Sequence, residues 1–302
     1  MIQSFGNFHN ENKLYIMRDD LIPYSFGGNK ARKAKLFFED IENKGSDSVV
    51  TYGSSSSNHC RIIANLAASK KLPCYIITPN QTQVSTFNNT LLRWFGTSII
   101  PCSINNVKDT IEEVLAGLQL KGLNPYLIEG GGHGNIGTRA YVNAFDEIID
   151  YEKKENIKFD YIFHASGTGT TQAGLICGKL INKSNVNVIG ISIARKNPRG
   201  KLVVLESVNS FLNSLSIEGI VEDDVFFTDK YILNGYGTFN DHIVRKAKEV
   251  MINFGIPLDY TYTGKAFWGM EEYIKENVIK EKKMLFIHTG GTPIFFDNLE
   301  VF

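Results

Sequence analysis

The sequence predicts an α/β protein built on mainly parallel sheets, and three observations support this fold class. Apolar runs of strand length alternate along the chain with longer segments whose apolar residues recur at helical spacing. The runs are rich in Val and Ile on both faces, which is typical of strands covered by helices on each side. Every run except the last is followed by a helical segment, which is the order that parallel sheets show along a chain.

The alternation places each expected element. The expected strands are residues 48–52 (SVVTY), 74–78 (CYIIT), 98–101 (SIIP), 125–128 (PYLI), 160–164 (DYIFH), 186–192 (VNVIGIS) and 284–288 (MLFIH). The expected helices are residues 29–44, 58–70, 84–95, 107–121, 137–154, 171–183, 240–253 and 265–280.

The alternation also predicts two domains. Residues 37–139 contain four strand–helix units, which suffice for a smaller α/β domain inserted into a larger one formed by residues 1–36 and 140–302. We therefore expect two open, twisted, mainly parallel sheets with helices on both faces. A ligand would lie between the two sheets, near the carboxyl ends of their strands.

Composition excludes several classes of protein. The chain has 302 residues, 43% of them hydrophobic, and its 32 basic side chains balance 32 acidic ones. It therefore lacks the overall positive charge of a protein that binds nucleic acid or anionic membranes. No apolar run approaches the ~18 residues of a membrane span, and no secretory signal is recognisable. The four cysteines are scattered without CxxC or zinc spacing, so we expect buried free thiols, no metal and a cytoplasmic location.

The first loop of chemical interest, residues 26–33 (FGGNKARK), opens an expected helix. Its glycines allow close approach of the backbone, and Lys30 lies in the first helical turn. Arg32, Lys33 and Lys35 crowd around Lys30. Positive neighbours or desolvation lower the pKa of a lysine and make its amine a usable nucleophile. The alternative is a solvated, basic start of a helix.

The second loop, residues 53–59 (GSSSSNH), follows a strand and opens a helix. Ser57, Asn58 and His59 can all donate hydrogen bonds there to an anion such as a carboxylate. The alternative is a cluster that caps the helix through Ser57 or Asn58, with His59 packed as a helix residue.

The third loop, residues 165–172 (ASGTGTTQ), joins a strand to an apolar helix. Glycines and hydroxyls at this position form a cradle of backbone amides for phosphate. The loop lacks the Gly-Lys-Ser/Thr ending of nucleotide hydrolases, so a phosphate-bearing cofactor held without metal fits better. A fourth loop, residues 132–137 (GHGNIG), matches GxGxxG, but no acidic residue ends the next strand. We therefore disfavour NAD and expect a tight turn near the cleft.

Together these loops resemble the pyridoxal-phosphate-dependent family of 1-aminocyclopropane-1-carboxylate (ACC) deaminase and D-cysteine desulfhydrase, which has the tryptophan synthase β-like fold (fold type II). The resemblance covers nearly the whole chain. Its motifs, in family order, are RDD at 18–20, GGNKARK at 27–33, SNH at 57–59, SGTGTTQAGL at 166–175, YTGKA at 262–266 and HTGG at 288–291.

The resemblance implies a role for each matching residue. Lys30 would attach covalently to pyridoxal 5'-phosphate and then remove the α-proton of an amino-acid substrate. Asn58 would hydrogen-bond the phenolic oxygen of the cofactor, and Thr289 would lie near its pyridine ring. The remaining site residues would hold the phosphate (Gly167, Thr168, Gly169, Thr170 and Thr171) or contact the substrate (Ser57, His59, Tyr236 and Tyr262). The family also implies a homodimer.

Two residues bear on the reaction. This chain has Thr263 and Thr289 where the deaminase pattern has Glu and Leu, as in the desulfhydrase pattern. Without a carboxylate at the pyridine nitrogen the cofactor is a weaker electron sink, which suffices to expel a β-leaving group. We therefore expect α,β-elimination, as of D-cysteine to pyruvate, sulfide and ammonia, with Tyr262 or Tyr236 assisting the leaving group.

Several alternatives stay open. They are ACC deamination, β-replacement, dehydration or racemisation of a polar amino acid, and a PLP-binding or partner-binding paralogue that has lost catalysis. The chain departs from the family at Ser54, Ser55 and Ser56 and at residues 129–133, which introduce Glu129 and His133 where substrate would enter. These polar additions put the native substrate in doubt.

Overall fold

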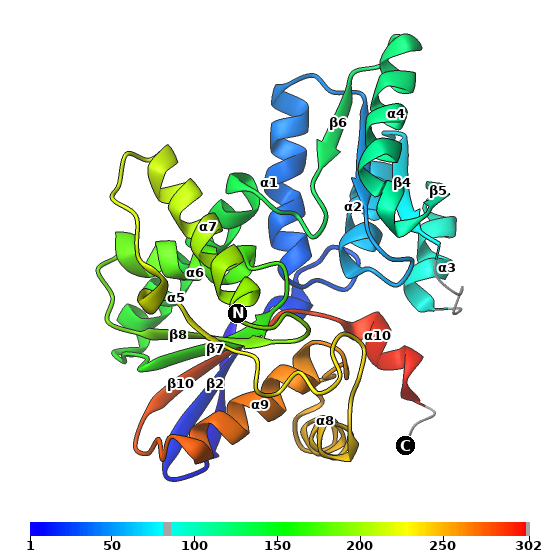
Figure 1. Cartoon of the computed structure of the whole chain (residues 1–302). Helices are drawn as coiled ribbons and strands as arrows, with labels where there is room; N and C mark the ends of the chain where they lie inside the picture. The colour runs from blue at the N-terminus through cyan, green and yellow to red at the C-terminus, as the bar shows by residue number, and fades with distance from the viewer. Residues whose placement is uncertain (81–85, 300–302) are drawn as a thin grey trace.

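Two separate sheets form the framework of the computed structural model, which describes residues 1–80 and 86–299 (Figure 1). The larger sheet has six strands in the order β1-β2-β10-β7-β8-β9. Only β1 runs antiparallel to its neighbour; the other pairs in this sheet are parallel. These strands are β1 (Ile2–Phe8), β2 (Asn12–Arg18), β7 (Tyr161–Ser166), β8 (Asn187–Ser192), β9 (Phe226–Thr228) and β10 (Lys283–His288).

The smaller sheet is entirely parallel, with the strand order β5-β4-β3-β6. Its strands are β3 (Ser48–Tyr52), β4 (Cys74–Pro79), β5 (Ser98–Cys102) and β6 (Pro125–Ile128). Both sheets have the mainly parallel character that the Val- and Ile-rich runs predict, so the expected α/β fold is confirmed. The division of the chain at residues 37 and 139 stays a prediction.

Helices cover both faces of the larger sheet because successive strand residues are apolar on opposite sides. Ile162 packs with α5 (Asn135–Glu155), α6 (Thr170–Ile181) and α7 (Arg199–Ser214) on one face. Phe163, the next residue of β7, packs with α8 (Asp241–Phe254) and α9 (Thr263–Glu276) on the other. The position of β7 is therefore set by packing on both sides.

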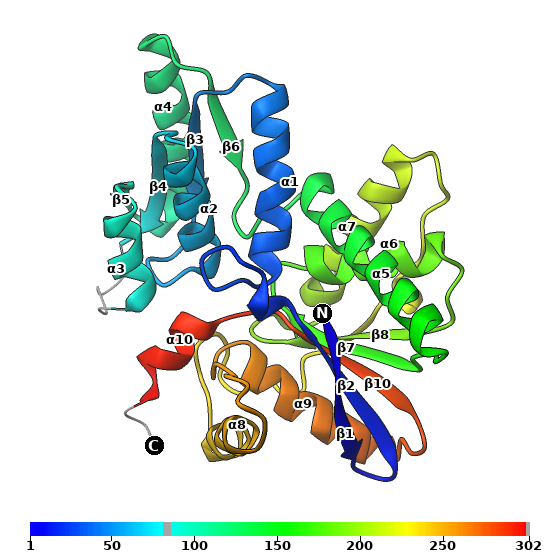
Figure 2. The same ribbon diagram turned by 180° about the vertical axis from the view of Figure 1, so that it is seen from behind.

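The smaller sheet is covered in the same way (Figure 2). Helices α1 (Asn29–Asn43), α2 (Asn58–Ser69) and α3 (Phe87–Trp94) pack on the face that contains Val49. Helix α4 (Val107–Leu120) packs on the opposite face, against Val50. Short 3₁₀ helices at Asp19–Leu21, Ile104–Asn106 and Glu222–Asp224 complete the secondary structure together with α10 (Thr292–Asp297).

Five elements escape the sequence pattern: β1, β2, β9, α7 and α10. Strand β1 lies at the edge of its sheet with several exposed residues, so it lacks the apolar run of a buried strand. Strand β9 and helix α10 have only three and six residues. The expected start of helix 84–95 at residues 84 and 85 lies outside the described residues; α3 begins at Phe87. Among the described residues, no helix is long and apolar enough to cross a membrane.

Candidate active site

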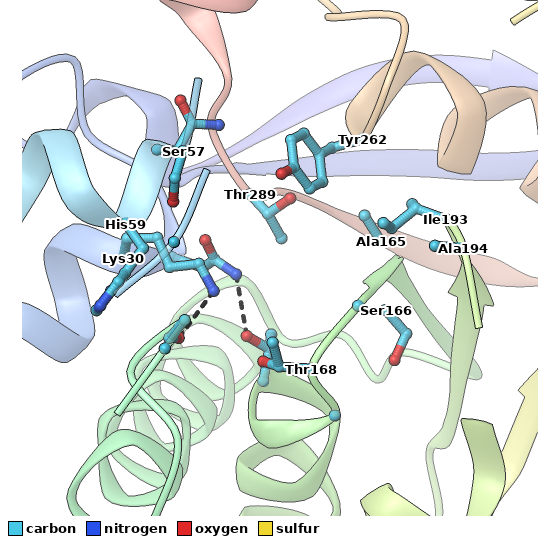
Figure 3. A pocket seen from close by; sticks show the side chains of 18 of the residues that line it. Lys30, Ser57, His59, Ala165, Ser166, Thr168, Ile193, Ala194, Tyr262 and Thr289 are labelled. Carbon is cyan, nitrogen blue, oxygen red and sulfur yellow. Dashed lines mark hydrogen bonds between the residues drawn. The ribbon is translucent and has the colours of Figure 1, made fainter. Parts of the chain in front are cut away.

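A cavity of about 410 Å³ lies at the carboxyl ends of strands from both sheets (Figure 3). The loops that follow β3, β6, β7, β8 and β10 all contribute to its wall, as expected for a ligand site in an open α/β fold. Eleven of the twelve predicted site residues line it: Lys30, Ser57, Asn58, His59, Gly167, Thr168, Gly169, Thr171, Tyr236, Tyr262 and Thr289. Thr170 does not; its hydroxyl lies 3.0 Å from Nδ1 of His133.

Lys30 enters the cavity because a glycine turn brings helix α1 against the loop after β10. Gly28 has φ +100°, and a side chain there would place its Cβ 2.7 Å from the backbone oxygen of Thr289. The next amide, that of Asn29, donates to the same oxygen at 3.0 Å. The half-buried Lys30 amine donates to the backbone oxygen of Gly131 at 2.9 Å. Desolvation by burial lowers the pKa of Lys30 to about 8.

The expected crowding of positive charge around Lys30 is only partly present. Arg32 is neutralised by two carboxylates, because its guanidinium donates to Asp19 at 2.8 Å and to Glu147 at 2.6 and 2.9 Å. Lys33 is buried, with its amine 3.5 Å from the Gly131 oxygen that also accepts from Lys30. Burial rather than positive neighbours is therefore the main cause of the lowered pKa of Lys30.

The predicted phosphate cradle lies at the start of α6. Gly169 precedes the helix with φ +90°, and a Cβ there would lie 3.3 Å from the backbone oxygen of Val203. The amides of the first helical turn have no partner within the helix and are available to an anion. The hydroxyl oxygen of Thr171 accepts from the Asn29 amide at 3.1 Å, so its hydrogen is free to donate to a ligand.

Ser57 is the N-cap of α2, since its Oγ accepts from the amide of Cys60 at 3.3 Å. The capping alternative is therefore correct for Ser57, which also lines the cavity. His59 is buried, and its Nε2 donates at 2.8 Å to Thr51, whose hydroxyl donates in turn to the backbone at 2.7 Å. Burial lowers the pKa of His59 well below its ordinary value, so the ring is neutral and one nitrogen is engaged in the fold.

Two tyrosines face each other across a hydrogen bond in the cavity wall. The hydroxyls of Tyr236 and Tyr262 lie 2.6 Å apart. Burial raises the pKa of both, and that of Tyr262 lies well above its ordinary value. The buried carboxylate of Asp259 holds this loop, since it accepts from the amides of Tyr262 and Thr263 at 2.7 and 3.1 Å. At neutral pH both tyrosines are therefore proton donors rather than bases.

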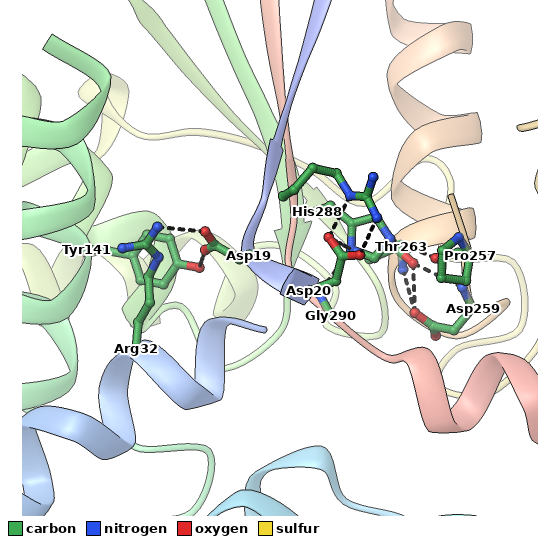
Figure 4. Close-up of polar contacts among 10 residues, drawn as sticks. Asp19, Asp20, Arg32, Tyr141, Pro257, Asp259, Thr263, His288 and Gly290 are labelled. Atoms are coloured by element: carbon green, nitrogen blue, oxygen red, sulfur yellow. Dashed lines mark hydrogen bonds and ion pairs between the residues drawn. The ribbon is translucent and has the colours of Figure 1, made fainter. Parts of the chain in front are cut away.

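A second layer of buried ion pairs fixes the loops around the cavity (Figure 4). Asp19 accepts from Tyr141 at 2.6 Å and from Arg32 at 2.8 Å, which ties α1 to α5. Asp20 receives two hydrogen bonds from Arg18 and lies 3.4 Å from His288, the residue before Thr289. These contacts link the turn that contains Asp19 and Asp20 to α1, which carries Lys30, and to the end of β10, which precedes Thr289.

Sequence reasoning missed several residues of the cavity. Tyr52, Ile193, Ala194 and Arg195 line it but belong to none of the recognised motifs. Their position directly at the end of an expected strand was the available signal, because strand ends meet at the ligand site of such folds. Of the residues in the divergent segment, Glu129 is exposed and accepts from the Tyr52 hydroxyl at 2.8 Å, at the edge of the cavity.

The lining chemistry fits pyridoxal phosphate. No acidic residue belongs to the described lining, while backbone amides, hydroxyls and an amine converge on it, which suits an anionic phosphate. Thr263 donates its hydroxyl to Asp259 at 2.8 Å and is buried outside the cavity. Thr289, by contrast, lines the cavity and carries no charge.

The fold and the cavity define a class: an α/β protein whose cavity combines a helix N-terminus suited to a phosphate with an amine of lowered pKa. Residues 2–290 match the family model described as "Pyridoxal-phosphate dependent enzyme". The chain belongs to this family, and the prediction of a PLP-dependent enzyme is confirmed.

Individual relatives support the same assignment. The chain is 31% identical to D-cysteine desulfhydrase of Klebsiella pneumoniae over 298 residues, which cover 95% of this chain and 89% of the relative. It is 32% identical to the Salmonella paratyphi A protein of that name over 292 residues, covering 94% and 88%.

Solved structures agree with these relatives. An ACC deaminase homologue is 30% identical, with a TM-score of 0.86 over 96% of this chain and 87% of that one. A hydrogen sulfide-producing enzyme from Fusobacterium nucleatum, 20% identical with a TM-score of 0.65 over 96% and 94%, supports the fold alone. The predicted similarity to the desulfhydrase and deaminase group, with fold type II, is therefore confirmed.

Proposed function

We propose that the chain is a lyase that eliminates a β-substituent from a small amino acid, with D-cysteine as the first candidate substrate. The overall reaction converts D-cysteine and water to pyruvate, hydrogen sulfide and ammonia. The observation that carries the proposal is the cavity itself. It combines the Lys30 amine, a phosphate cradle and a pair of protonated tyrosines, and no described lining residue is acidic.

Lys30 is the proposed proton acceptor. Pyridoxal phosphate, when bound, supplies an electron sink that stabilises negative charge at the α-carbon of an amino acid. With a pKa of about 8, the free Lys30 amine is partly unprotonated near neutral pH and can accept the α-proton at Nζ. The carbonyl of Gly131, 2.9 Å away, accepts a hydrogen bond from this amine and orients it in the cavity.

Tyr262 and Tyr236 are the proposed proton donors to the leaving group. Their hydroxyls are 2.6 Å apart, so one donates to the other and the acceptor keeps its own hydrogen for a substrate atom. Their raised pKa values keep both protonated while a thiolate departs. Ser57 is proposed to bind the substrate carboxylate, and Asn58 to hold the ring of the cofactor.

The phosphate is proposed to be held by Gly167, Thr168, Gly169 and Thr171, with the backbone of Thr170 completing the turn. Thr289 is proposed as the neutral partner of the pyridine nitrogen. A neutral partner favours loss of a β-substituent over opening of a cyclopropane ring. This makes ACC deamination the less favoured candidate despite the structural likeness to an ACC deaminase homologue.

The test incubates the PLP-loaded enzyme with D-cysteine, L-cysteine or ACC. Release of 2-oxo acid is measured for all three compounds, and release of sulfide for the two cysteines. We expect turnover of D-cysteine and a loss of about 10²–10⁴-fold in kcat for Tyr262→Phe. The control variant is Tyr151→Phe, whose ring stacks on Phe159 outside the cavity and should leave kcat unchanged. Full activity of Tyr262→Phe would contradict the assigned role. If neither D-cysteine nor L-cysteine released sulfide, that result would contradict the proposed reaction.

Polar residues behind the cavity wall support a wider choice of substrate. Ser54 and Ser56 lie 3.3 Å apart, and Ser54 interacts with the hydroxyl of Tyr236, which lines the cavity. Other amino acids with a polar β-substituent therefore belong in the same assay, which also distinguishes β-replacement, dehydration and racemisation. A cytoplasmic location and a homodimer stay predictions from the sequence and the resemblance.

A further inference from the structure

Arg61 is a buried cation without a carboxylate partner among the described residues. Its side chain lies on α2 and is 0% exposed. Nη1 donates to Oδ1 of Asn58 at 2.8 Å and to Oδ1 of Asn88 at 2.9 Å, while Nε and Nη2 have no hydrogen-bond partner. Desolvation alone lowers the pKa of Arg61 to about 9, so the group stays charged at neutral pH. Its guanidinium also lies over the ring of Phe26, 5.9 Å from the centroid. Burying a cation without a counter-ion destabilises a fold, so packing alone does not account for this residue.

Asn88, on α3, completes the arrangement. Its side chain is also 0% exposed, and its Nδ2 donates to the backbone oxygen of Ser56 at 2.7 Å and to Oδ1 of Asn58 at 3.0 Å. The orientation of this amide is fixed by chemistry, because Arg61 can only donate and a backbone carbonyl can only accept. Asn88 must therefore present its oxygen to Arg61 and its nitrogen to Ser56 and Asn58.

The same reasoning fixes the amide of Asn58. Its Oδ1 accepts from two groups that cannot accept in return, the guanidinium of Arg61 and the Nδ2 of Asn88. A flipped Asn58 would place its NH₂ group against both donors. Its Nδ2 is thus the free donor of a residue that lines the cavity. The adjacent positive charge polarises the amide and strengthens Nδ2 as a donor.

Helix α3 is itself held by the C-terminal helix. The amide of Phe87 donates to a carboxylate oxygen of Asp297 at 2.8 Å, and the rings of Phe87 and Phe296 pack edge to face with centroids 6.5 Å apart. Asn88, the next residue, is therefore placed by contacts with α10, which follows β10 of the larger sheet. The orientation of Asn58 thus depends on elements from both sheets.

We propose that Arg61 and Asn88 are positioning residues that hold the Asn58 amide with Nδ2 directed into the cavity, as the hydrogen-bond donor to the ring oxygen of pyridoxal phosphate. This proposal rests on the proposed function, which places the cofactor in this cavity. Neither Arg61 nor Asn88 lines the cavity, so both act through Asn58.

The first test compares cofactor affinity with fold stability. Arg61→Met removes the charge and both hydrogen bonds while keeping an unbranched side chain. We expect the Kd for pyridoxal phosphate to rise by about tenfold or more, as for a lost hydrogen bond to a charged oxygen. The cofactor-free variant should unfold at about the same temperature as the wild type, because removal of the buried charge offsets the loss of the contacts with Asn58, Asn88 and Phe26. Unchanged affinity would overturn the proposal.

The second test asks whether Arg61 acts through Asn58. In an Asn58→Ala background, Arg61→Met should produce no further rise in Kd. An equal rise in both backgrounds would overturn the proposal. Asn89→Ala is the matched control: this neighbour is also buried on α3, its Oδ1 has no partner, and its removal should leave the Kd unchanged.

A spectroscopic measurement separates positioning from a general loss of fit. In Arg61→Met the ionised ring oxygen of the cofactor loses the hydrogen bond that Asn58 is proposed to donate, and it becomes more basic. The pH at the midpoint of the absorbance change of the bound cofactor should therefore rise. An unchanged midpoint would contradict a donor role for Asn58. If the wild type binds no pyridoxal phosphate, the proposed function fails as well. If the wild type and Arg61→Met bind it equally, only the positioning role fails.

Discussion

The amine of Lys30 is expected to titrate about 2.5 pH units below an ordinary lysine, because burial lowers its pKa from 10.5 to about 8. At pH 7 an amine of pKa about 8 is ~9% unprotonated, whereas one of pKa 10.5 is ~0.03% unprotonated. The wall of the cavity therefore increases the reactive fraction of this amine about 300-fold. This increase supports the proposed roles of Lys30 as a nucleophile toward a carbonyl cofactor and as a base near neutral pH.

Competitive acetylation of the cofactor-free protein measures this titration directly. The pH is varied from about 6 to about 11, and the labelling of each lysine is followed by peptide mass spectrometry. Lys108, whose side chain is 86% exposed, serves as the solvent-exposed internal reference. The labelling of Lys30 should reach half its plateau near pH 8. Parallel curves for the two residues would refute the argument that burial activates Lys30.

Two further predictions concern stability. Burial lowers the pKa of Lys33 in the folded chain well below its ordinary value of 10.5. Between the lowered pKa and 10.5, the unfolded chain binds a proton at Lys33 that the folded chain does not. The free energy of unfolding should therefore rise with pH up to about 10.5, and this rise should be smaller in Lys33→Met. Urea titrations of both proteins at pH ~7 and ~10 measure the difference. Gly174→Ala would place a methyl group 2.4 Å from atoms of α5 and should cost about 3 kcal/mol. Gly117→Ala, with no atom within 4 Å of the added Cβ, should instead stabilise the protein by about 0.5–1 kcal/mol; destabilisation by both would contradict the packing argument.

The sequence predicts the fold best where strands are buried on both faces. The run 160–164 corresponds to β7, whose neighbours Ile162 and Phe163 pack on opposite faces and therefore make a continuous apolar run. Strand β1 is at an edge and has no such run, so its pairing with β2 depends on contacts that no local pattern records.

The candidate site was predictable where its polar groups lie in loops next to the ends of strands. Lys30, the 165–172 cradle and the SNH segment were recognisable because glycines, hydroxyls and amides interrupt the apolar pattern there. The partners of these groups were not recognisable. Arg32 is paired with Glu147, more than a hundred residues away, so one member of the charge cluster seen in the sequence is neutralised in the fold. The roles of Arg61 and Asn88 likewise depend on packing between α2 and α3.

The most direct test of the account is to locate the covalently held cofactor. The PLP-loaded protein is reduced with borohydride, digested and mapped by mass spectrometry, with Lys30→Ala and Lys33→Met treated in parallel. The account predicts a phosphopyridoxyl group on Lys30 in the wild type and in Lys33→Met, and none in Lys30→Ala. A label on Lys33, or no label in the wild type, would contradict the assignment of Lys30 as the lysine of a pyridoxal-phosphate enzyme.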